Sequence, residues 1–322
     1  MEFLQEIDDR GYPAEYLLAR IHGRRLSMLS DWDTVMSSPD IAEYPATSNV
    51  REFMTAGTPT GIWEKYLKES AWIYHQMNSR LRSVFQPYFM YFELNTLLTC
   101  LRYKAGKGNS AEIERLLYFS LLSKGIKDVL KTDADILSVL KILGKKVSFI
   151  RDNSTGLEQV FLKDGLKGAE QKITGALFKY ILNVDTHPLI KSFFVFIADA
   201  RNIITLHKHL KWDTTSGPFF IEGGNIKKII LNKILHSYNT DALTALVYKQ
   251  TGLRIEGPDA SRVENALQRL LTRMIKKWER ECPDVGLILN YLWRCAMESK
   301  NLSVIYHGRE LERGILKEEL VY

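Results

Sequence analysis

FELNTLL (residues 92–98), DARNIITL (199–206) and ESKNLSVI (298–305) share one pattern, in which an asparagine opens an apolar helical run. The asparagines lie 107 residues apart (95 to 202) and then 99 (202 to 301). An acidic residue that begins a short helical run recurs upstream, at steps of 102 (33 to 135) and 106 (135 to 241). Two independent marks at nearly constant spacing predict an internal repeat of a helical unit. The marks are Asn95, Asn202 and Asn301, and Asp33, Asp135 and Asp241.

The repeat divides the chain into three expected units, residues 1–105, 106–211 and 212–322. Apolar residues at helical spacing dominate each unit, so the predicted fold class is all-α. Each unit is expected to hold short helices, a long helix, a proline break and then the asparagine-bearing helix, with the breaks at Pro87, Pro188 and Pro283. The stretch KKVSFIRDNSTG (145–156) is the best candidate for a strand and turn. No low-complexity linker separates the units, which favours packed units.

Composition indicates an ordinary soluble protein, with 45% hydrophobic and 25% charged residues among 322. Its three cysteines, Cys100, Cys282 and Cys295, cannot all pair, so a reducing compartment is expected. The acidic start MEFLQEIDDRG lacks the features of a signal peptide. No apolar stretch approaches the roughly 20 residues that cross a bilayer.

The acid and the asparagine of each repeat are expected to act together. Asp199 and Asn202, and Glu298 and Asn301, are three residues apart and share a helix face. In the first copy Phe92 holds the position of the acid, and Glu93 is one step off that face. We interpret the asparagines as structural clamps between two helices, bonded to a neighbouring long helix and to the acid one turn earlier. A catalytic role is disfavoured, because three equivalent copies do not fit one active site.

Several kinds of site are disfavoured by the sequence. The glycine-lysine stretches at 106–108 and 144–146 lack the spacing of a phosphate loop. His207 and His209 are two residues apart, so they point to different sides of a helix, and we expect surface residues rather than a metal site. No GxSxG elbow occurs, and the basic stretch at 276–280 is diluted by acid. We therefore expect no cofactor, no small-molecule substrate and no nucleic-acid partner.

The closing stretch, residues 291–322, resembles the carboxy-terminal signature of the C-subunit family of rotary ATPases, whose members in eukaryotic vacuolar pumps are the d subunits. The residues that match are Glu298, Asn301, Leu302, Ile305, Gly308 and Arg309. DARNIITLHKHLKW and FFIEGG resemble the middle signature of that family, at Asp199, Asn202, Leu206, Phe220, Ile221 and Gly224. YLLARIHGRRLSML resembles its amino-terminal helix, at Tyr16, Ala19, Arg20 and Arg24. The resemblance extends over essentially the whole chain.

This resemblance implies three quasi-equivalent helical units in a pseudo-threefold, funnel-shaped arrangement. It also implies a non-catalytic rotor part, cytoplasmic and peripheral to the membrane, which caps the proteolipid ring and receives the central stalk. Residues 106–211 carry 17 basic and 11 acidic residues, and this positive charge suits an acidic partner, a phosphate backbone or an anionic lipid surface. With the resemblance, our hypothesis is that basic residues there, Lys145 and Lys146 in particular, meet acidic residues of the ring or stalk. Excess lysine that serves only solubility explains the charge equally well. A helical-repeat scaffold unrelated to rotary ATPases, and after it a soluble enzyme, are the alternatives.

Overall fold

The computed structural model describes residues 2–37, 59–106, 108, 110–151, 156–212, 217–252, 260–308 and 310–321. Regular structure in these ranges is helical, with an isolated antiparallel bridge between Leu4 and Leu122. The prediction of an all-α fold is confirmed. The short helix expected near residues 49–55 and the signature residue Arg309 lie outside the described residues.

The chain forms two compact units, and each is described by itself. The first comprises Met1–Tyr12, Ser70–Val195 and Ile221–Gly223, and the second Pro13–Glu69, Phe196–Phe220 and Gly224–Tyr322. Helices α4 (Pro59–Gln76) and α11 (Pro188–Trp212) contribute residues to both units. The three repeat boundaries and the threefold funnel stay predictions, because compactness does not test whether units are homologous.

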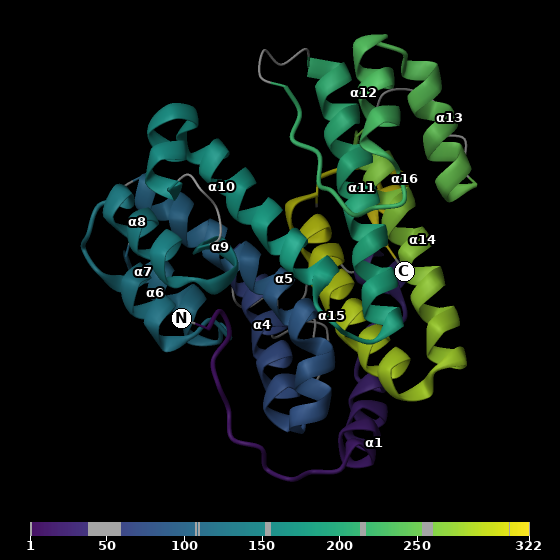
Figure 1. Cartoon of the computed structure of the whole chain (residues 1–322). Coiled ribbons are helices and arrows are strands. Elements are labelled where there is room, and N and C mark those ends of the chain that lie inside the picture. The colour runs from purple at the N-terminus through teal and green to yellow at the C-terminus, as the bar shows by residue number, and fades with distance from the viewer. Residues whose placement is uncertain are drawn as a thin grey trace. The chain divides into compact units, whose positions relative to one another are not determined.

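The first unit is built on two long helices, α5 (Ser79–Ala105) and α10 (Leu157–Asn183). Shorter helices pack with them, and α8 lies beside α10 (Figure 1). These are α6 (Ser110–Tyr118), α7 (Lys124–Lys131), α8 (Ile136–Lys146) and α9 (Ser148–Arg151). Aromatic rings fill the core, among them Tyr88 and Phe193, whose ring centroids are 5.7 Å apart.

The strand predicted within residues 145–156 is wrong for the part that the structure describes. Lys145 and Lys146 end α8, and Ser148–Arg151 forms the single turn α9. One helical turn buries both Phe149 and Ile150, whereas a strand would have placed these neighbours on opposite faces. Burial of both side chains therefore favours the turn.

Pro87 does not break its helix, contrary to the sequence prediction. It lies inside α5, and the break falls earlier in the chain, at Asn78. The Asn78 side chain caps α5 by accepting a hydrogen bond from Leu81 N at 3.0 Å. A proline inside a helix costs about 3 kcal/mol or more, but Phe85, Tyr88 and other side chains of α5 are fully buried, and this burial outweighs the cost.

The second unit is organised by a hairpin of α14 (Ala260–Glu281) and α15 (Pro283–His307) (Figure 1). The other helices of this unit are α1 (Ala14–Arg25), α2 (Trp32–Ser37), α12 (Lys228–His236), α13 (Thr240–Thr251) and α16 (Arg313–Glu319). Gly286 allows the two helices of the hairpin to approach closely, because a Cβ atom there would lie 2.6 Å from the Trp278 carbonyl oxygen. The backbones of α14 and α15 thus meet at a point where no side chain fits.

The other two proline predictions are confirmed. Pro188 is the first residue of α11, and Pro283 is the first residue of α15. Proline suits the first turn, where its missing N–H has no helical partner to lose. Within the described ranges, every helix is too short or too polar to serve as a membrane span.

Candidate functional site

Three buried carboxylates mark the long helices that carry the sequence repeat. Glu93 on α5, Asp199 on α11 and Glu298 on α15 are 3%, 5% and 6% exposed. They recur at steps of 106 residues (93 to 199) and 99 (199 to 298), close to the steps of the asparagines. This spacing favours Glu93 as the acid of the first predicted copy, although the sequence analysis placed it off the face.

Glu93 holds the segment that leads into α7. One carboxylate oxygen accepts a hydrogen bond from Leu121 N at 2.6 Å, and the other accepts from Ser120 Oγ at 2.6 Å. Lys127 donates to the Ser120 carbonyl oxygen at 2.6 Å. Burial raises the pKa of Glu93, and the two hydrogen bonds oppose that rise.

Asp199 holds the segment that leads into α12 in the same way. Its two oxygens accept from Asn225 N at 3.0 Å and Ile226 N at 2.9 Å. Burial raises the pKa of Asp199 against these two bonds. Gly224 belongs to this arrangement, because a Cβ atom there would collide with Asp199 Oδ1. The signature glycine thus leaves room for the carboxylate.

Glu298 holds the segment that leads into α2. Its Oε2 atom accepts a hydrogen bond from Leu29 N at 3.3 Å. In the predicted repeats, the acid of the first copy thus binds a segment of the second, and the acid of the second binds a segment of the third. The acid of the third copy binds a segment of the first. The contacts follow a cyclic order.

Replacement by the neutral amide should destabilise the protein more at Asp199 than at Glu93. Both donors to Asp199 are backbone N–H groups, which cannot become acceptors, whereas the Ser120 hydroxyl beside Glu93 can rotate and accept. Asp199→Asn should therefore lower the free energy of unfolding by about 2 kcal/mol, and Glu93→Gln by less than about 1 kcal/mol. Guanidinium denaturation of both variants checks this. Equal losses would contradict the assigned hydrogen bonds.

Asn301 clamps a different partner from the one that the sequence analysis expected. Its Nδ2 donates to the Val321 carbonyl oxygen at 2.8 Å, and its Oδ1 accepts from Val321 N at 2.9 Å. The amide therefore binds an extended segment after α16, and it does not clamp a helix. Both residues are buried, at 0% and 1% exposure.

The other signature residues have separate environments. Asn202 is buried at 1% exposure, whereas Asn95 is half-buried on α5. Gly308 ends α15, with its N–H bonded to the Val304 carbonyl oxygen at 2.8 Å, and a Cβ atom there would lie 2.5 Å from Leu316 Cδ2. Within the second unit Asp199, Glu298 and Asn301 therefore act as separate braces.

Arg24, which matches the family on α1, ties three helices together. Its Nη1 donates to Glu69 Oε1 at 3.1 Å and to Oε2 at 2.8 Å, and Glu69 belongs to α4. The Tyr291 hydroxyl on α15 donates to Glu69 Oε1 at 2.8 Å. This network fixes α1 against α15.

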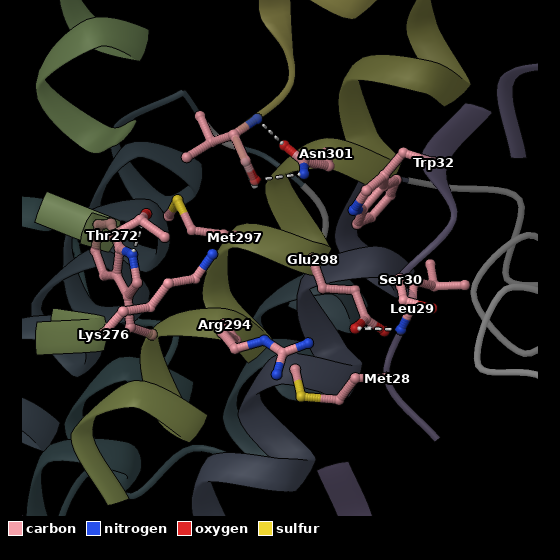
Figure 2. A pocket seen from close by; sticks show the side chains of 12 residues that line it. Met28, Leu29, Ser30, Trp32, Thr272, Lys276, Arg294, Met297, Glu298 and Asn301 are labelled. Carbon is pink, nitrogen blue, oxygen red and sulfur yellow. Dashed lines mark hydrogen bonds between the residues drawn. The ribbon is translucent and has the colours of Figure 1, made fainter. Parts of the chain in front are cut away.

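A cavity of about 320 Å³ opens beside two of the signature residues. Glu298 and Asn301 line it from α15, and Lys276 lines it from α14 (Figure 2). Met28 and Trp32 line the side formed by the segment before α2 and the start of that helix. Sequence reasoning missed this pocket, because residues 28 and 32 meet residues 276 and 298 only in the fold.

The remaining candidates are placed as follows. Lys145 and Lys146 are exposed in the last turn of α8. His207 is buried at 6% exposure, so the prediction of a surface residue is wrong for it, and His209 is half-buried. Three or more metal-ligating side chains do not gather anywhere in the described ranges. Cys100, Cys282 and Cys295 are free thiols.

A comparison with known protein families identifies the family of this chain. The family described as ATP synthase (C/AC39) subunit matches residues 19–315. The chain belongs to this family. The resemblance inferred from the sequence is thereby confirmed, and the matched range includes all the signature residues from Asn95 to Gly308. A search of the curated proteins finds no match.

Membership of this family identifies the chain as a subunit of an A/V-type ATP synthase. The family is part of the A/V-type ATP synthases, which are rotary complexes bound to membranes. The match ends at residue 315, so Val321, the partner of the Asn301 amide, lies outside the matched range.

Proposed function

We propose that the chain is the rotor adaptor of an A/V-type rotary ATPase, joining the central stalk to the proteolipid ring. In this role it transmits torque between ATP chemistry and the transport of protons or sodium ions, and it performs no catalysis itself. The observation that carries the proposal is the family match over residues 19–315. It disfavours the alternative of a scaffold unrelated to rotary ATPases.

The three carboxylate braces support a mechanical role. Torque transfer needs a body whose parts keep their places under load, and close-packed interiors have low compressibility. Glu93, Asp199 and Glu298 each fix the backbone of a connecting segment to a long helix. Each of these acids binds a segment of the next predicted repeat in cyclic order, which supports the expected threefold plan.

The experiment that tests the adaptor role measures coupling. Membranes depleted of this chain should hydrolyse ATP without pumping ions, and adding the purified chain back should restore ATP-driven pumping. Normal pumping in depleted membranes would contradict the proposal. As a control, adding the purified chain to membranes that lack the ATP-hydrolysing head should give no ATP-driven pumping.

We propose further that Lys145 and Lys146 contact acidic residues of the ring or stalk. Both side chains are exposed in one helical turn, so they present positive charge to a partner. Reversing both to glutamate should weaken capture of the ring and stalk proteins about tenfold at low salt, and raising the salt should narrow the difference. The matched control is arginine at both positions, which keeps the charge. Equal capture by the glutamate and arginine variants would exclude this pair as a contact.

A further inference from the structure

The pocket between α14, α15 and residues 28–32 holds more positive charge than its own residues neutralise. Lys276 and Arg294 extend into it from α14 and α15, and Glu298 supplies one carboxylate (Figure 2). Among the residues that the structure describes, neither Lys276 nor Arg294 forms a hydrogen bond or ion pair. Two cations and one carboxylate give the described lining residues a net charge of +1.

Arg294 is the informative member of this pair. It is half-buried, whereas Lys276 is exposed. A guanidinium ion withdrawn from water is usually paired with a carboxylate or phosphate, because its five donors then keep partners. Glu298, one turn along α15, already accepts from Leu29 N, and it makes no ion pair with Arg294 within 4.0 Å. Among the residues with a described position, no anion pairs with the Arg294 cation in the cavity.

The pocket walls restrict the chemistry of that anion. Trp32 and Trp293 are nearly buried, at 8% and 3% exposure, and Met28 and Met297 add flexible apolar surface. Such walls accept the methylene groups of a side chain, while a guanidinium fork matches the two oxygens of a carboxylate. A net charge of +1 suits one carboxylate, and the nearby Glu298 would repel a doubly charged phosphate.

We infer that this pocket receives an acidic side chain, with an adjoining apolar residue, from another polypeptide. The guanidinium of Arg294 binds the carboxylate, Lys276 adds charge at the mouth, and the methionine and tryptophan side chains cover the apolar part. The identity of this polypeptide as a component of the rotary complex rests on the proposed function. The preference of the pocket for an acidic side chain does not depend on the proposed function.

The chemistry is tested on the isolated full chain labelled with ¹³C in the methionine methyl groups. The chain has 8 methionines, and Met28 and Met297 report on the pocket. The probe is the peptide acetyl-Ala-Leu-Glu-Leu-Ala-amide, and the matched control has glutamine in place of glutamate. The glutamate peptide should shift both methyl signals saturably, with an affinity about tenfold higher than that of the glutamine peptide.

Two variants separate binding from folding. Arg294→Gln should remove the preference for the glutamate peptide, whereas Arg273→Gln, at an exposed position of α14, should keep it. Circular dichroism confirms that both variants are folded. Equal shifts with both peptides, or no shift with either, would overturn the inference. Stronger binding of inorganic phosphate than of the peptide would also overturn it.

The partner is tested in membranes. A photoreactive benzoylphenylalanine at Ser30, which lines the pocket, should cross-link to a protein of the rotary complex within a few residues of an aspartate or glutamate. If proteins of the complex accompany the chain but no such cross-link forms, the partner assignment is wrong. If none of them accompanies the wild-type chain, the proposed function fails, and the methionine experiment still decides the ligand.

Discussion

Gly286→Ala should lower the free energy of unfolding by about 3 kcal/mol, a large effect for the addition of a single methyl group. The added Cβ atom would lie 2.6 Å from the Trp278 carbonyl oxygen and 2.7 Å from Glu279 Cα. Both are backbone atoms of α14, so no side chain can rotate away. The α14–α15 hairpin must separate, and the packing around it is lost.

A matched control exists in α1. A Cβ atom at Gly23 would meet no atom within 4 Å, and the residue is exposed within the helix. Gly23→Ala should therefore stabilise the protein by about 0.5–1 kcal/mol, because alanine favours the helix. Guanidinium denaturation followed by circular dichroism measures both variants. A Gly286→Ala midpoint equal to that of the wild type would show that the helices are not in backbone contact.

Asn301→Ala should cost about 3 kcal/mol, since it leaves two buried backbone groups without partners. The N–H and the carbonyl oxygen of Val321 both bond to the Asn301 amide, and Val321 is 1% exposed. Water can reach these two backbone groups only if the segment around Val321 separates from α15. Hydrogen exchange at Val321 N–H should accelerate together with the loss of stability.

The control for this prediction is Asn183→Ala. Asn183 is exposed, and its Nδ2 donates to the Lys179 carbonyl oxygen on its own helix, so the change should cost less than about 0.5 kcal/mol. Comparable losses of stability in the two variants would mean that the hydrogen bonds to Val321 contribute no more than an exposed side-chain hydrogen bond.

The sequence predicted the all-α fold, because helical spacing of apolar residues reports which face is buried. It also predicted the breaks at Pro188 and Pro283, where proline occupies a first turn. It failed at Pro87, because burial of the aromatic residues of α5 depends on the tertiary fold. The missed signal was Asn78, a residue that caps a helix with its side chain.

The site was predicted only in part, for physical reasons that can be named. Asp199, Glu298 and Asn301 are buried and polar, as their spacing with apolar neighbours suggested. Their partners lie far along the chain, 269 residues away for Leu29 and Glu298, and no local pattern indicates such pairs. Glu93 was recognisable, since its 106-residue step to Asp199 nearly equals the asparagine step.

The most direct test of the adaptor role is to purify the tagged chain from membranes in mild detergent and identify what accompanies it. We predict that the proteolipid ring and the central-stalk proteins co-purify in fixed proportion to the chain. Recovery of the chain without either, or with partners that belong to no rotary ATPase, would contradict the adaptor role.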